Sequence, residues 1–79
     1  MTTYGIYDAT NWDDNVITIT IQECYFDGNY WFAQKINAKK HKIKVSDEDN
    51  KELCREEIRE YVRNLNINVH NIDSKFSIK

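Results

Sequence analysis

Two runs that alternate between apolar and polar residues dominate this chain. The first covers residues 16–26 (VITITIQECYF) and the second covers residues 29–38 (NYWFAQKINA), with Asp27-Gly28 between them. A period of two and many β-branched and aromatic residues are typical of β-strands. An Asp-Gly pair favours a two-residue type I′ turn, because both central residues of that turn need a positive φ. We therefore expect a β-hairpin.

The register of this hairpin decides which side chains share a face. A two-residue turn places Phe26 opposite Asn29 and Tyr25 opposite Tyr30. One face then carries large apolar residues, and it is the face that we expect a helix to cover: Ile17, Ile19, Ile21, Tyr25, Tyr30, Phe32 and Ile36. The other face starts with polar residues and becomes bulky near the turn: Thr18, Thr20, Gln22, Lys35, Cys24, Phe26, Trp31 and Ala33.

Apolar side chains on both faces near the turn have three explanations that the sequence leaves open. In the first, the N-terminal strand or the C-terminal tail covers the second face. In the second, a β-bulge near Gln22-Glu23 shifts the register, so that Cys24 and Phe26 rejoin the core. In the third, Phe26 and Trp31 are exposed and contact a partner, because exposed apolar clusters mark interaction sites.

Flanking segments complete the sheet in this interpretation. Residues 3–8 are expected to form a first strand, and residues 11–15 form a turn rich in Asn and Asp. Residues 41–45 (HKIKV) alternate in polarity and predict a fourth strand. The tail offers one or two short terminal strands, at residues 67–69 and 76–78.

One helix is predicted after the fourth strand. Ser46 is a natural N-cap, and the acidic residues 47–49 follow it at the positive end of the helix dipole. We expect the helix to run to about Asn64, and both Asn64 and Asn66 can adopt the left-handed conformation that ends helices. One apolar stripe would face the sheet: Cys54, Ile58, Tyr61, Val62 and Leu65. The pattern predicts an α+β fold, with a small antiparallel sheet of three to five strands in the order β-β-β-(β)-α-β and one amphipathic helix packed on one face.

Length and composition fit a single compact domain that covers residues 1–79. The chain has no proline and two glycines, which leaves no segment typical of a linker. No apolar run approaches the roughly 18 residues that a membrane span needs, and the first residues do not resemble a signal peptide. We therefore expect a cytoplasmic protein in which Cys24 and Cys54 are reduced.

No arrangement of reactive side chains points to catalysis or to a metal. Cys24, His41, Cys54 and His70 are residue types that bind zinc, but they lack the close pairs from which small zinc sites are built. A thiol–imidazole pair of Cys24 and His41 would have no recognisable oxyanion hole or orienting group. We therefore expect a protein that is not an enzyme and needs no metal or cofactor.

The charges are distributed in blocks, although the net charge is only −2. Residues 1–33 contain five acids and no lysine or arginine, whereas residues 34–46 contain five lysines and no acid. Together with Trp31, these lysines resemble the basic and aromatic surfaces of single-strand nucleic-acid binders: Lys35, Lys39, Lys40, Lys42 and Lys44. A pI of about 5.6 counts against this interpretation, because nucleic-acid-binding domains are usually basic.

In size and in its Asn-, Ile-, Lys- and Asp-rich composition, the chain is similar to small proteins that bacteriophages and mobile elements use to block host machinery, such as anti-CRISPR and anti-restriction proteins. The similarity implies an inhibitor that binds a host protein or ribonucleoprotein complex and occludes its nucleic-acid-binding surface. The expected contacts are aromatic anchors and nearby carboxylates: Tyr25, Phe26, Tyr30, Trp31, Asp13, Asp14 and Asp27. The alternatives are single-stranded nucleic-acid binding through the lysines and a homodimer that buries the aromatic patch or pairs sheet edges.

Overall fold

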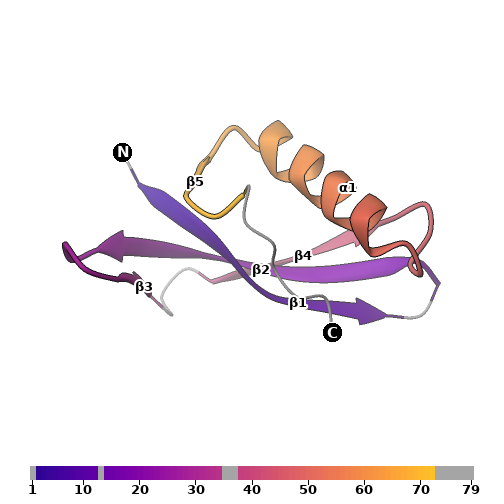
Figure 1. The fold of residues 1–79 in the computed structure, drawn as a ribbon, viewed down its shortest axis with the longest axis horizontal. Helices are drawn as coiled ribbons and strands as arrows, with labels where there is room; N and C mark the ends of the chain where they lie inside the picture. The colour runs from indigo at the N-terminus through magenta and orange to yellow at the C-terminus, as the bar shows by residue number, and fades with distance from the viewer. Residues whose placement is uncertain (1, 13, 35–37, 73–79) are drawn as a thin grey trace.

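The computed structural model describes residues 2–12, 14–34 and 38–72. Within these residues, one sheet lies beneath one helix (Figure 1). The elements are β1 (Thr3–Trp12), β2 (Val16–Phe26), β3 (Trp31–Ala33), β4 (Lys39–Lys44), α1 (Lys51–Asn64) and β5 (Asn68–Val69). The predicted α+β fold and its order of elements are therefore confirmed.

The sheet is organised around β2, which pairs along both of its edges. β1 pairs with one edge over nearly its whole length, and β3 and β4 follow one another along the other edge. All these pairs are antiparallel, as predicted. β5 adds to the free edge of β1 in the parallel direction, so the sheet as a whole is mixed.

The connection between β2 and β3 differs from the predicted two-residue turn. It is a four-residue loop, because Phe26 pairs with Trp31 instead of Asn29. The carboxylate of Asp27 accepts the backbone N–H groups of Asn29 and Tyr30, each at 2.8 Å, and these bonds hold the wider loop. Gly28 adopts a positive φ of 105° and Asp27 does not, so the type I′ turn is wrong.

The resulting register is displaced by two residues from the predicted one, with Tyr25 opposite Phe32. Because side chains alternate with a period of two, a shift of two leaves every residue on its predicted face. Phe26 and Trp31 therefore still share one face, and Tyr25 and Phe32 share the other.

The second arm of the hairpin is interrupted. The predicted strand over residues 29–38 reduces to β3, and the chain rejoins β2 as β4 with its register shifted by three residues. β2 itself is continuous through Gln22 and Glu23, so the bulge considered there is absent and the irregularity lies in the opposite arm. A separate irregularity falls in β1 between Tyr7 and Thr10, where Asp8 has a positive φ of 53°.

β1 is longer than predicted, because it extends through Asn11 to Trp12. The turn that follows contains two consecutive residues with positive φ, Asp14 and Asn15. The observed turn is therefore shorter than the one predicted over residues 11–15. The possible strand at residues 76–78 lies outside the described residues.

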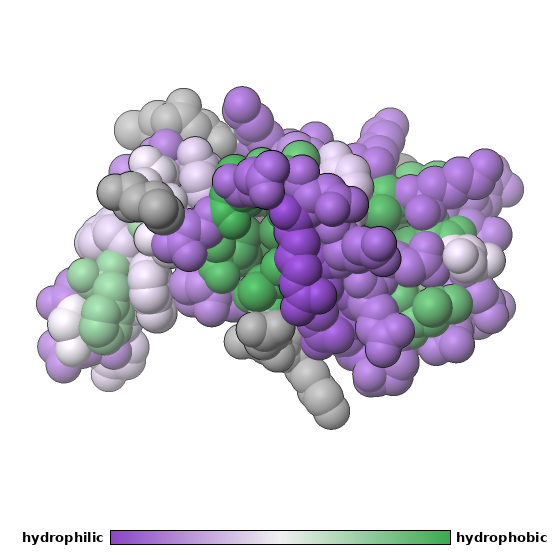
Figure 2. Space-filling model, turned by 90° about the horizontal axis from the view of Figure 1, so that it is seen from above, coloured by the Kyte–Doolittle hydropathy of each residue, from purple (hydrophilic) through white to green (hydrophobic). Residues whose placement is uncertain are grey.

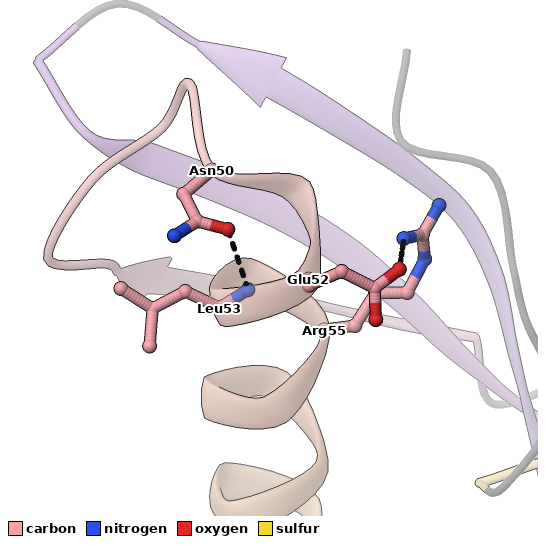
Figure 3. A network of polar contacts seen from close by, with 4 residues as sticks. All are labelled: Asn50, Glu52, Leu53 and Arg55. Carbon is pink, nitrogen blue, oxygen red and sulfur yellow. Dashed lines mark hydrogen bonds and ion pairs between the residues drawn. The ribbon is translucent and has the colours of Figure 1, made fainter.

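The helix begins four residues later than predicted. Its N-cap is Asn50, whose side-chain oxygen accepts the backbone N–H of Leu53 at 3.1 Å (Figure 3). Ser46 is instead bonded to the carboxylate of Glu57 through its backbone N–H and its hydroxyl. Residues 47–49 therefore precede the helix, and the acid in its first turn is Glu52, which pairs with Arg55 at 2.9 Å (Figure 3).

The core lies between α1 and the sheet, and the predicted helical stripe is confirmed for its central residues. The most deeply buried side chains are Ile17, Ile19, Cys54, Ile58 and Val62. Cys24 is also buried, but it lies on the opposite face of the sheet from Cys54, and both thiols are free. α1 covers the half of the sheet that contains β4, and the end that carries β3 extends beyond it (Figure 1).

Candidate functional site

Five aromatic side chains are exposed where β2 and β3 meet, and we call this group the aromatic tip. Its members and their exposed fractions are Tyr25 (48%), Phe26 (53%), Tyr30 (70%), Trp31 (42%) and Phe32 (42%). In Figure 2 the same end of the molecule, at the left, displays hydrophobic surface. The expectation that the helix covers Tyr25, Tyr30 and Phe32 is therefore wrong, because α1 does not reach the tip.

The rings of the tip form two stacked pairs on opposite faces of the hairpin. Tyr25 and Phe32 stack with ring centroids 5.5 Å apart, and Phe26 and Trp31 stack at 5.4 Å. Each pair joins residues that are directly opposite across β2 and β3. The tip thus presents apolar surface on both sides, as a protruding element that enters a groove would.

A third stacking contact was not signalled by the sequence. His70, directly after β5, stacks on Trp31 with ring centroids 4.2 Å apart and planes 9° from parallel. Partial burial lowers the pKa of His70. We call Phe26, Trp31 and His70 the ring stack. No periodicity could have revealed this contact, because it joins two strands at opposite ends of the sheet order.

The predicted carboxylates are not gathered at the tip. Asp27 lies in the tip loop, where backbone N–H groups of Tyr30 and Asn29 hold the pKa of its carboxyl below the usual range. Asp14 lies in the turn before β2, at the far end of that strand. The eleven residues of β2, ten steps of about 3.3 Å, separate the two ends by about 33 Å. Asp13 lies outside the described residues.

The lysine segment divides between the two faces of the sheet. Lys40, Lys42 and Lys44 pair with Thr20, Thr18 and Val16, which face away from α1, and we call these three lysines the lysine row. Lys39 pairs with the buried Ile21 and lies on the helix side. Lys35 lies outside the described residues.

A groove of about 380 Å³ lies on the helix side, where α1 ends. It is lined by Tyr4, Ile21, Glu23, Lys39, His41, Leu65 and Ile67. The Nδ1 atom of His41 lies 3.0 Å from the hydroxyl of Tyr61, so this imidazole contacts the helix. Cys24 lies on the other face of the sheet, which separates the two members of the thiol–imidazole pair that the sequence suggested.

The Cys24 thiol lies beside the Tyr7 side chain and interacts with it. Burial raises the pKa of Cys24, and burial together with the neighbouring Cys24 raises the pKa of Tyr7. Both groups are therefore neutral at ordinary pH. Among the described residues, no group of three or more His, Cys, Asp or Glu side chains is placed to hold a metal ion.

α1 is the one helix in the described part of the chain, and it is neither long enough nor apolar enough to cross a membrane. No protein-family model matches this sequence. Neither a curated protein nor a solved structure matches the chain significantly.

Proposed function

We propose that this protein is a non-enzymatic inhibitor that binds another protein by inserting the aromatic tip into an apolar groove. The observation that carries the proposal is the exposure of five large aromatic side chains at one end of the β2–β3 hairpin. Aromatic residues dominate the binding energy of protein interfaces, and exposed apolar clusters mark interaction sites.

The stacked pairs add a second argument. Rings that already pack against a neighbour lose little conformational freedom when a partner covers them, so more of the contact energy remains as affinity. Tyr25 with Phe32 and Phe26 with Trp31 are held in this way. The Asp27 carboxylate fixes the loop between them through two backbone hydrogen bonds.

The charge near the tip indicates the chemistry of the partner. Residues 1–33 contain no lysine or arginine, and Asp27 and Glu23 are the acids of the tip and of the adjoining strand. A groove with a basic rim, such as a protein uses to hold nucleic acid, complements this surface. We propose that the tip occludes such a groove in a host protein or ribonucleoprotein complex. Size and composition support an anti-defence role, in the manner of anti-CRISPR or anti-restriction proteins.

Affinity capture tests the proposal. The immobilised protein is incubated with host lysate, and wild type is compared with a variant that carries Tyr25→Ala and Phe26→Ala. A control variant carries Lys51→Ala and Glu56→Ala on the exposed side of α1. We expect wild type and the control to retain one partner in a one-to-one ratio, and the tip variant to lose at least tenfold in affinity for the purified partner. Equal retention by all three proteins would show that the tip is not the binding surface.

Self-association is a separate outcome with its own measurement. Sedimentation equilibrium of the purified protein distinguishes a monomer from a dimer. A mass that doubles with concentration, and that stays at the monomer value when Tyr25 and Phe26 are replaced, would make a second copy of the chain the partner of the tip.

A further inference from the structure

The lysine row is a regular array of positive charge. Its three members are exposed and alternate along β4, so successive ammonium groups start from backbone positions about 6.6 Å apart. β4 pairs with β2 along one edge, and within the described residues its other edge is unpaired.

The face that carries the lysine row contains no acid among the residues paired in the sheet. Its members on β1 and β2 are neutral, including Thr10, Thr18, Thr20 and Gln22, but Thr18 and Thr20 are buried, so a ligand on this face would contact the exposed lysines and not these threonines. The glutamates of α1 lie on the opposite side of the sheet. The low overall pI therefore hides a separation of charge, with positive charge on the face away from the helix.

The same face carries aromatic rings. Phe26 and Trp31 occupy it because side chains at even positions of β2 point away from α1, and Trp31 pairs with Phe26. His70 stacks on Trp31 there. Six residues of β2 separate the positions opposite Lys40 and Trp31, which corresponds to about 20 Å.

We propose that this face binds single-stranded nucleic acid, with phosphates along the lysine row and bases against the outer rings of the ring stack. Positively charged strands next to aromatic rings are the recurrent means by which proteins hold single strands. Phe26 and Trp31 also belong to the aromatic tip, so a protein that covers the tip and a single strand that stacks on these rings would compete for them. The lysine row lies outside the tip, so its contribution to oligonucleotide affinity is measured independently of any protein partner.

Lysines on an unpaired edge strand also have a structural use, because they prevent edge-to-edge aggregation. The two roles differ in a measurable way. An edge-protecting lysine affects the association state of the protein, whereas a phosphate-binding lysine changes the salt dependence of oligonucleotide affinity. The test therefore measures both quantities.

Fluorescence anisotropy with a labelled oligonucleotide of about 12 nucleotides tests the site, since single-strand platforms cover roughly 4–16 nucleotides. Three phosphate contacts predict that log K falls with log salt concentration with a slope of about −2. Affinity should then drop by about 20-fold between 50 and 200 mM salt. DNA and RNA probes are compared, together with a duplex of the same sequence.

Lys39 supplies the matched control, because it lies on the same strand but on the helix side. We expect Lys42→Gln to reduce the magnitude of the salt slope by about 0.7. Lys42→Arg should keep the wild-type slope, and Lys39→Gln should also leave it unchanged. Phe26→Leu should weaken binding severalfold without changing the slope, because it removes a stacking surface but no charge. Size-exclusion chromatography of each variant reports its association state.

Three results would overturn the proposal. The first is absence of binding at 50 mM salt. The second is an equal effect of Lys39→Gln and Lys42→Gln, which would indicate attraction by net charge alone. The third is a duplex affinity equal to that of the single strands.

Discussion

The imidazole of His70 lies flat on the indole of Trp31, with ring centroids 4.2 Å apart. The contact joins the aromatic tip to the segment after β5, although β3 and β5 are at opposite ends of the strand order. Trp31 therefore has two roles, as an exposed ring of the tip and as a contact for the segment that follows β5.

Replacement of His70 should loosen the tip. Aromatic pairs contribute about 0.5–1.5 kcal/mol beyond the area that they bury, so we expect His70→Ala to lower the free energy of unfolding by an amount in this range. Urea unfolding measures the change in the free energy of unfolding. The fluorescence of Trp31, measured in a Trp12→Phe background, should shift to longer wavelength. His70→Phe retains a stacking ring and should preserve both properties. A similar loss in both variants would contradict a stacking role.

Asn71 should be required for the pairing of the C-terminal segment with β1. Its side chain accepts the backbone N–H of Ile6 and donates to the carbonyl of Ile6, each at 2.9 Å, and so replaces a strand neighbour. Asn71→Ala leaves both groups of Ile6 without this partner, and a cost of about 1–3 kcal/mol is expected. Hydrogen exchange of the Ile6 amide should accelerate accordingly. Asn68→Ala, which removes an exposed hydrogen bond to Thr3, should have a smaller effect.

A methyl group at position 5 should uncover the Cys24 thiol. A Cβ atom on Gly5 would lie 2.7 Å from the hydroxyl oxygen and from Cε2 of Tyr7, so the ring must move. Cys24 is buried and burial raises its pKa, which predicts slow alkylation in the wild type. In Gly5→Ala we expect faster labelling of Cys24, measured by mass spectrometry of the peptides. Cys54 is the internal control, because its labelling would report global unfolding instead.

Acid should release the tip loop at a pH below the ordinary Asp range. Backbone N–H groups of Tyr30 and Asn29 bond the charged form and lower the folded-state pKa of Asp27 below the ordinary Asp range. Such a group contributes stability that is present above the unfolded pKa and is lost as the pH falls through the folded pKa. The amide shifts of Asn29 and Tyr30 should therefore titrate with a midpoint below the ordinary Asp range. Asp27→Asn keeps an acceptor but removes the charge, and this transition should be absent from its titration.

The sequence correctly predicted the elements in which the pattern of apolar and polar residues matches the burial of the side chains. β2 has the predicted bounds, because its isoleucines alternate with threonines against a continuous core. The helical stripe of Cys54, Ile58 and Val62 is likewise buried as expected. In these segments local propensity and tertiary packing favour the same structure.

The errors arise where side chains form hydrogen bonds that a pattern does not encode. Asp-Gly predicts a tight turn, but the Asp27 carboxylate stabilises a longer one by accepting two backbone N–H groups. Ser46 is a residue type that often caps helices. Here its backbone N–H and hydroxyl donate hydrogen bonds to the carboxylate of Glu57, and Asn50 caps the helix instead. The Asp27 bonds are local and compete with the tight turn, whereas the contact of Ser46 with Glu57 forms only when the segment before α1 folds back on the helix.

The sequence predicted only part of the candidate surfaces. The loop is longer than predicted by two residues, an even number, so Phe26 and Trp31 remain on one face although the predicted register was wrong. The shift between β3 and β4 determines which lysines join them, and the sequence does not reveal it. Asp14 does not join the aromatic residues as expected. It lies in the turn at one end of β2, and the aromatic tip lies at the other end.

Because β5 pairs with β1, the position of His70 next to Trp31 depends on residues at the start of β1. Thr3 and Tyr4 hold Asn68 and Val69, and the carbonyl of Tyr4 accepts the backbone N–H of His70. Removing Thr3 and Tyr4, or attaching a bulky tag next to them, would release His70, whose ring stacks on the indole of Trp31. An affinity tag for interaction studies is therefore better attached elsewhere.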